Sequence, residues 1–156
     1  MPEAEIATAI QLLDLMLEFF ANDDHWTRGS YDDGKGGHCL VGALLHLSRK
    51  HCLPAAPVIA LLQDAMPRPG LPLVYFNDSR CGSIAELRSV ILKARRSADD
   101  DAERERAAAA VKNWLLAQID KNEPRRPSTP GNQRRTSHSL PKALPLRLLS
   151  QCDGTI

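Results

Sequence analysis

Aromatic side chains and long apolar runs are both scarce in this chain. Aromatic residues make up 4% of the 156 residues, so we expect an aliphatic core. No apolar run reaches the roughly 18 residues that span a bilayer, which argues against an integral membrane protein. The first residues include Glu3 and Glu5 and no basic segment, so we expect no secretory signal and a cytoplasmic protein.

The low net charge of +1 hides two parts of opposite sign. Residues 122–156 carry six basic and two acidic side chains, a net of +4, which leaves residues 1–121 at −3. Five of the eleven prolines also lie in residues 122–156. We therefore predict a globular domain over residues 1–121 and a basic, proline-rich, disordered tail over residues 122–156. Nucleic acid is not an expected partner, except through weak, salt-dependent contacts of the tail.

The spacing of apolar residues predicts a mainly α-helical domain. The expected helices cover residues 4–21, 38–51, 56–66, 83 to about 98, and about 99–120. We expect a break between the last two at Asp99–Asp101, and we expect the final helix to dock through its second half, which holds Val111, Trp114 and Leu115.

Two segments do not follow this helical pattern. Residues 73–76 have a β-like composition, and residues 25–38 are rich in glycine, which leaves a short hairpin and a compact loop both open for the latter. The predicted fold is thus a compact domain of four or five helices with at most a small β-hairpin.

Cys39 is the most suggestive candidate for chemistry. It follows His38 and begins a helix, where the helix dipole and free N–H groups lower the pKa of a thiol. His46 lies two helical turns further on and is a second candidate base. These residues would support a cysteine-dependent hydrolase or transferase, whereas a small residue that packs at the start of a buried helix explains Cys39 without catalysis.

Neither metal nor cofactor is expected. His25, His38, Cys39 and Cys81 are acceptable zinc ligands, but their spacing matches no compact zinc site. The chain's four cysteines form no CxxC pair, so we expect free thiols, with a Cys39–Cys81 disulfide left open.

Asn77 and Asp78 follow the β-like run and precede a helix whose first residues, Ser83 to Glu86, form a capping box. In one interpretation their side chains only satisfy backbone groups at the turn. In the other, they face Trp26, Tyr31 and Cys39 across a groove between residues 26–39 and 75–83, which would then be a binding site.

Three short motifs resemble those of a family of small bacterial proteins known only as a domain of unknown function. They are Trp-x-x-Gly from Trp26, Cys-x-x-Gly-Ala-Leu from Cys39, and an aromatic-Asn-Asp turn ending at Asp78. The resemblance covers about residues 6–98 and implies a compact, mainly helical domain. It implies no activity.

From these observations we expect a non-enzymatic, intracellular bacterial binding or regulatory module. Its expected site is the groove bordered by Trp26, Tyr31, Cys39, Asn77 and Asp78. A protein is the expected partner, a small molecule the second candidate, and a membrane is not expected. The competing prediction is the cysteine-dependent enzyme, with Cys39 as nucleophile and His38 or His46 as base.

Overall fold

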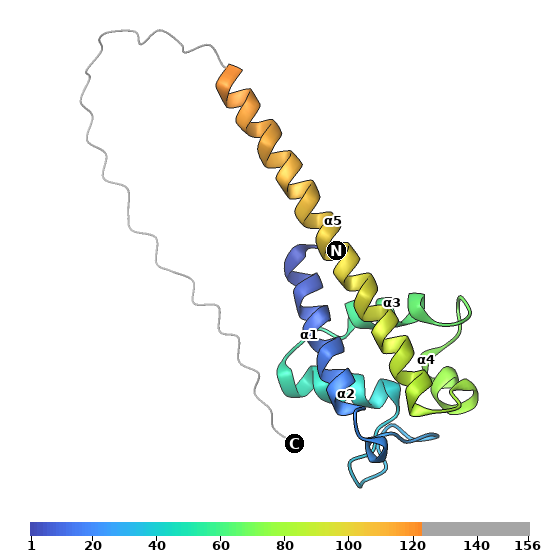
Figure 1. Cartoon of the computed structure of the whole chain (residues 1–156). Helices are drawn as coiled ribbons and strands as arrows, with labels where there is room; N and C mark the ends of the chain where they lie inside the picture. Colours follow the sequence, from blue (N-terminus) through green and yellow to red (C-terminus); the bar gives the residue numbers. More distant parts are fainter. Residues whose placement is uncertain (123–156) are drawn as a thin grey trace, which may run out of the picture. The chain divides into compact units, whose positions relative to one another are not determined.

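The computed structural model describes residues 1–122, so the predicted tail from residue 123 onward lies outside the described residues. The chain divides into a unit of residues Met1–Trp114 and a second that begins at Leu115. In chain order the elements are α1 (Glu3–Phe19), η1 (Asp23–His25), α2 (Leu40–His51), α3 (Ala56–Ala65), α4 (Leu73–Tyr75), η2 (Phe76–Arg80) and α5 (Ile84–Asn122) (Figure 1). The predicted mainly α fold is confirmed.

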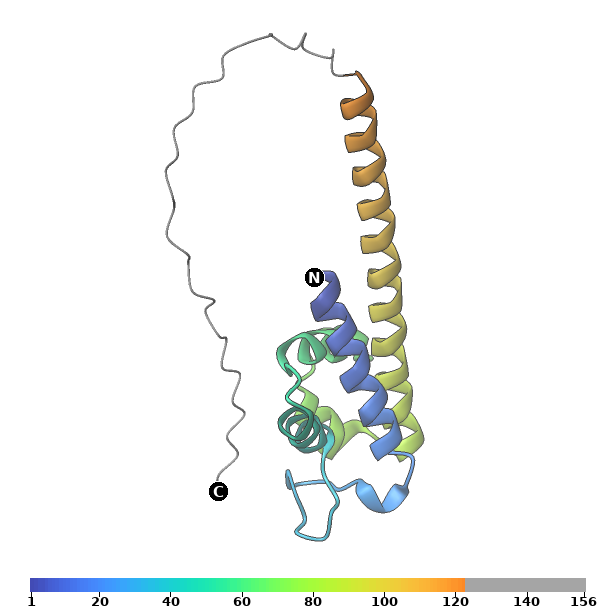
Figure 2. The same cartoon turned by 90° about the vertical axis from the view of Figure 1, so that its left-hand side faces the viewer.

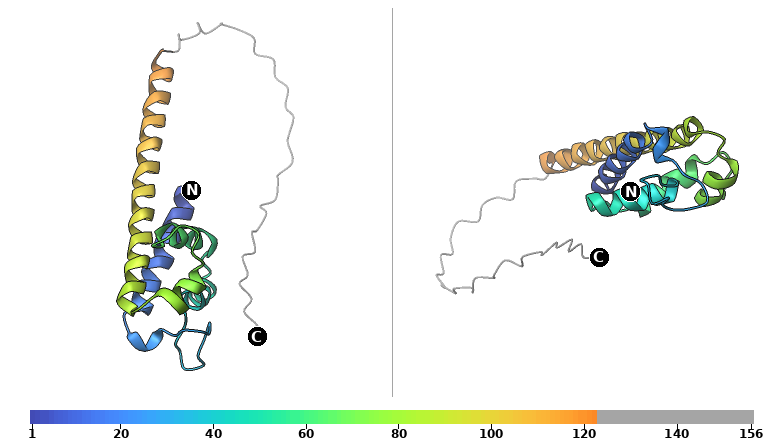
Figure 3. Two further views of the ribbon diagram at one scale, coloured as in Figure 1. Left: turned by 90° about the vertical axis from the view of Figure 1, so that its right-hand side faces the viewer. Right: turned by 90° about the horizontal axis from the view of Figure 1, so that it is seen from below.

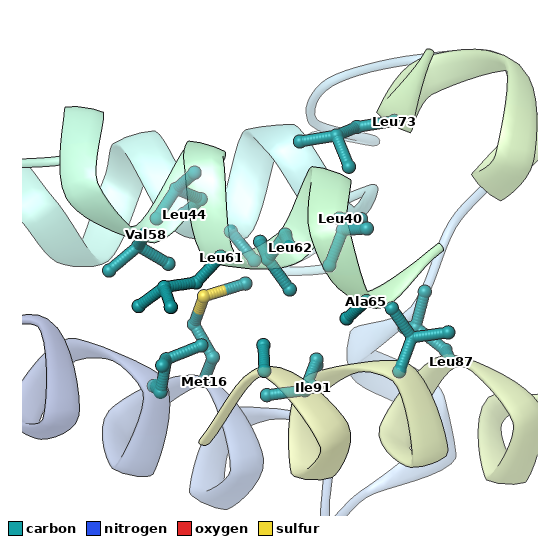
Figure 4. Close-up of a cluster of buried hydrophobic side chains, with 14 of the residues drawn as sticks. Met16, Leu40, Leu44, Val58, Leu61, Leu62, Ala65, Leu73, Leu87 and Ile91 are labelled. Atoms are coloured by element: carbon teal, nitrogen blue, oxygen red, sulfur yellow. The ribbon is translucent and has the colours of Figure 1, made fainter. Parts of the chain in front are cut away.

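The first unit is built as two layers of helices around an aliphatic core. Helix α1 lies beside the first half of α5, and α2 and α3 lie across from them (Figure 2). Side chains from both layers meet between them, among them Met16 from α1, Leu44 from α2, Leu62 from α3 and Ile91 from α5 (Figure 4). All four are fully buried, as expected for a chain that has few aromatic residues to fill its core.

Between α1 and α2 the chain forms an irregular segment, which we call the 26–39 loop. It lies at one end of the unit, where α1 finishes and α2 begins (Figure 3). Two isolated β-bridges, Trp26 with His38 and Asp32 with His38, hold the loop together. Within residues 1–122 these bridges do not extend into the paired strands of a hairpin. The compact loop is therefore the correct one of the two alternatives.

The β-like composition of residues 73–76 suggests an extended segment, and that interpretation is wrong. Leu73–Tyr75 is the helical turn α4, which begins after Pro72 and continues into the π-helical turn η2. The amide of Phe76 donates to the Pro72 carbonyl at 2.9 Å, and that of Cys81 to the Phe76 carbonyl at 2.7 Å. Pro72 has the φ that suits a helix start, and packing of Leu73 and Phe76 into the core overrides their β-propensity.

The predicted break at Asp99–Asp101 is also wrong, because α5 continues through it. Asp99 pairs with Arg95 one turn earlier, and the Asp101 carboxylate lies 2.7 Å from Arg104 three residues later. Such pairs stabilise a helix by a few tenths of a kcal/mol each, about 0.2–0.5. Arg95 also contacts Asp14 of α1 at 2.7 Å, which ties α5 to the first helix.

The expected docking of the last part of α5 is not observed either. Val111 and Trp114, both in the first unit, are 59% and 61% exposed, and Leu115 in the second unit is 50% exposed. The apolar spacing correctly predicted a helix here, but it could not show that the other elements of the first unit leave Val111 and Trp114 exposed.

Candidate functional site

Asn77 lies in the irregular turn η2 and is the centre of a buried hydrogen-bond network. Its side chain is 0% exposed. The Asn77 Oδ1 atom accepts a bond from Trp26 Nε1 at 2.9 Å and another from the amide of Leu40 at 3.1 Å. Its Nδ2 atom donates to the Thr27 carbonyl at 3.1 Å and to Asp78 Oδ1 at 2.7 Å. One amide side chain thus joins η2, the 26–39 loop and the first residue of α2.

The neighbouring Asp78 and Arg28 add two more links between the loop and η2. Asp78 Oδ1 accepts a bond from the amide of Gly29 at 3.0 Å, and the Arg28 guanidinium donates to the carbonyl of Cys81. The same guanidinium lies over the Trp26 ring, 4.5 Å from its centroid, in a cation–π contact. The loop is therefore held in one conformation by side chains from fifty residues further along the chain.

Beside this network lies a cavity of about 90 Å³, which we call the small cavity. Its walls come from the loop, from the start of α2 and from the α4–η2 segment: Gly29, Ser30, Tyr31, Cys39, Val74 and Asp78. This is the place of the predicted groove. Tyr31, Cys39 and Asp78 line it. Trp26 and Asn77 do not, but the bonds of Asn77 join the segments that form its walls.

Cys39 is the N-cap residue of α2, as its position in the sequence suggested. Its side chain is 2% exposed, and its sulfur accepts a hydrogen bond from the amide of Gly42 at 3.2 Å. This bond satisfies one of the N–H groups that a helix start leaves without an intrahelical partner. Cys81 is also buried and donates its S–H to the Ser83 carbonyl at 3.2 Å. Both residues are thiols, so the Cys39–Cys81 disulfide is not formed.

The two candidate bases, His38 and His46, stack on one another instead. Their ring centroids are 4.8 Å apart, and the ring planes differ by 28°. His38 is buried and its Nδ1 atom lies 3.1 Å from the Tyr31 carbonyl, within hydrogen-bond distance. Phe19 of α1 contacts the His38 ring, stacks on His25 and meets Phe20 edge to face, so five rings form a continuous cluster.

The environment of His46 favours its neutral form. Partial desolvation by its neighbours lowers the pKa of His46, and the nearby His38 and Lys50 lower it further. Asp32 acts in the opposite direction but is the smaller influence. An imidazole of this kind can accept a proton from a ligand, and it becomes a cation only in acidic solution.

A larger cavity of about 620 Å³, which we call the α2 cavity, lies along the exposed side of α2. Helix α2 supplies one wall and the 26–39 loop the other: Tyr31, Asp32, His38, Gly42, Leu45, His46, Arg49 and Lys50. Tyr31 lines both cavities and is 59% exposed. The sequence analysis proposed Tyr31, His38 and His46 as site residues but not Arg49 and Lys50. Basic residues are common in the last turn of a helix, where they complement the helix dipole, so their position did not indicate a site.

Gly42 appears in the sequence analysis only as part of the Cys-x-x-Gly-Ala-Leu motif, with no structural role assigned to it. An ideal Cβ at this position would lie 1.9 Å from the carbonyl oxygen of Tyr31, so the loop backbone passes directly over α2 here. A glycine inside a helical pattern is the available signal for such an approach. The contact fixes how closely the Tyr31 backbone approaches the start of α2, and Tyr31 lines both cavities.

Among residues 1–122 no group of three or more histidine, cysteine or acidic side chains is arranged to hold a metal ion. His25, His38, Cys39 and Cys81 in particular are engaged separately, in ring contacts and in hydrogen bonds to the backbone. Within the same residues, none of the helices has the length and apolar character needed to cross a membrane.

The fold and the two cavities define a small α-helical domain with a rigid loop at one end. Residues 5–97 match the model of a family of unknown function, DUF6197, and the chain belongs to this family. The match covers the loop, both cavities and the first part of α5, in agreement with the resemblance seen in the sequence. No curated protein matches the chain, and no solved structure does.

Proposed function

We propose that this protein is a non-enzymatic binding module of the bacterial cytoplasm that recognises a protein partner through the face around the small cavity. The observation that carries the proposal is the Asn77 network. A buried polar side chain costs free energy unless each of its groups is hydrogen-bonded. The buried Asn77 side chain meets this condition through bonds that hold the irregular 26–39 loop in one conformation. A loop fixed in advance loses less entropy when it binds a partner.

The exposed residues at this face fit recognition of a protein. Tyr31 is 59% exposed and Val74 is 37% exposed, and both line the small cavity with the half-buried Asp78. Tyrosine is enriched in protein interfaces, because it buries a large rigid ring and keeps a polar tip. The small cavity, at about 90 Å³, fits a single side chain of a partner and is too small for most metabolites.

Site-specific photo-crosslinking in the native host tests this proposal. A photoreactive phenylalanine analogue at Tyr31 or at Val74 is expected to give a discrete crosslinked adduct. The same analogue at Leu92 of α5, which is 41% exposed and outside the small cavity, is the control and is expected to give none. Equal adducts at all three positions, or no adduct at Tyr31 and Val74, would contradict a partner at this face.

The alternative is a cysteine-dependent hydrolase or transferase with Cys39 as nucleophile. The burial of Cys39 and the hydrogen bond from Gly42 favour a capping role, and His38 is turned toward the Tyr31 carbonyl. A binding module is the better account, because a nucleophile must be reachable by its substrate.

Labelling with iodoacetamide separates these two accounts. We expect Cys39 and Cys81, both buried, to react more slowly than the exposed Cys52, with the rates measured peptide by peptide in a mass spectrometer. Fast labelling of Cys39, ahead of Cys52, would indicate an activated thiolate and support the enzyme instead.

A further inference from the structure

We propose that the α2 cavity binds a small organic anion, whose charged group is held by Arg49 and Lys50 and whose planar part lies against Tyr31 and His46. This inference goes beyond the proposed function, because it concerns a different cavity, most of whose lining comes from α2, and it holds whether or not a protein binds at the small cavity. The volume of about 620 Å³ lies within the usual range for ligand pockets, roughly 300–1,000 Å³.

The charges that line the α2 cavity favour an anion. Arg49 and Lys50 are exposed, and within residues 1–122 neither has a carboxylate at ion-pair distance. Asp32 is the single acidic residue of the lining, and its Oδ1 atom already accepts a bond from the amide of Gly34 at 2.6 Å. The cavity therefore offers two cationic side chains with unused donors, which suit a carboxylate, sulfonate or phosphate group.

The rest of the lining favours a flat apolar portion in the same ligand. The exposed Tyr31 ring, the exposed His46 ring and the side chain of Leu45 are aromatic or apolar surfaces. His46 is already stacked on His38 on one side, which restricts its orientation before a ligand arrives. Aromatic rings gain most from offset or edge-to-face contacts with another ring, worth about 0.5–1.5 kcal/mol beyond area burial.

Protonation of His46 would strengthen the site in acid. The groups that face His46 are the His38 ring and Asp32 from the loop, Phe19 from α1, and Lys50 and His51 from its own helix. Burial, His38 and Lys50 lower the pKa of His46, so the neutral form of its ring is favoured at neutral pH. When the pH falls through that lowered pKa, His46 gains a positive charge in the cavity, and an anion should bind more tightly.

Nuclear magnetic resonance titration of the full chain with sodium benzenesulfonate tests the proposal, because this probe combines a ring with a charge that does not titrate. The neutral benzenesulfonamide, of nearly the same shape, is the matched ligand control. We expect benzenesulfonate to shift the amide signals of Gly42, Leu45 and His46, and to bind more tightly than the sulfonamide. The affinity for benzenesulfonate should increase as the pH is lowered from about 8 to about 5.

Variants of the two cations supply the second arm of the test. Arg49→Gln and Lys50→Gln should each weaken benzenesulfonate binding by roughly two- to fivefold, as expected for exposed charge pairs. Lys112→Gln, which removes an exposed lysine outside the cavity, is the matched control and should leave the affinity unchanged. Equal affinity for the charged and neutral probes, or the same affinity in the Arg49, Lys50 and Lys112 variants, would overturn the proposal.

Discussion

Replacing Asn77 by alanine is expected to lower the free energy of unfolding by about 4 kcal/mol. The change removes both bonds to Oδ1 and both from Nδ2, so Trp26 Nε1, the Leu40 amide and the Thr27 carbonyl lose their partner inside the protein. Each unsatisfied buried group costs about 1–3 kcal/mol. Urea denaturation followed by circular dichroism measures the loss.

A loss of this size is a large fraction of the stability of a small domain, so milder variants are needed. Trp26→Phe removes the bond from Nε1 and part of the ring that lies under the Arg28 guanidinium, and it should cost about 1–2 kcal/mol. Asn22→Ala is the matched control, because Asn22 is exposed and accepts one bond, from the amide of Asp24 at 3.2 Å. If Asn77→Ala were no more destabilising than Asn22→Ala, the network would not be holding the loop.

Gly42→Ala is expected to destabilise the protein by about 3 kcal/mol, although alanine is the better helix former by about 1 kcal/mol. The added Cβ would lie 1.9 Å from the Tyr31 carbonyl oxygen and 2.8 Å from the Tyr31 carbonyl carbon. Both are backbone atoms and cannot rotate away, so either the loop or the start of α2 must move. We expect large changes in the amide signals of Tyr31 and His38, together with the loss of stability.

Gly82→Ala is the control for this prediction. At Gly82 an added Cβ would meet only the end of the Glu86 side chain, at 3.4 Å, and the residue is exposed before α5 begins. This variant should change the stability by no more than about 0.5 kcal/mol. A stabilising effect of Gly42→Ala would show that the loop backbone does not lie against the start of α2 in the way that the distances indicate.

Part of the site could be predicted from the chain because local rules determine it. A residue that follows a glycine-rich segment and precedes an apolar helical pattern is a good candidate for an N-cap, which is where Cys39 lies. The sequence analysis also brought Asn77 and Asp78 together with Trp26 and Tyr31, as the two sides of an expected groove. It left open whether these side chains bind a ligand or the protein's own backbone, and for Asn77 the structure shows the latter.

The errors arose where neighbours in space outweigh neighbours in sequence. Residues 73–76 have a β-like composition, but burial of Leu73 and Phe76 makes them helical. Asp99–Asp101 resemble a helix start, yet the pairing of Asp99 with Arg95 lets α5 continue through them. Local composition cannot predict the burial of residues 73–76 or the pairing of Asp99, because each depends on which other side chains lie nearby in the folded protein.

By itself, the sequence determined the helical class of the domain, the boundaries of the first three helices to within a few residues, and the aliphatic nature of the core. These properties follow from the periodic spacing of apolar residues and from caps and prolines, all of which act over a few residues. Only the tertiary structure decided that Arg49 and Lys50 share a cavity with Tyr31. It also decided that the buried Asn77 side chain holds the 26–39 loop through hydrogen bonds. Contacts between segments far apart in the chain depend on how the layers pack, which the pattern along a single segment does not contain.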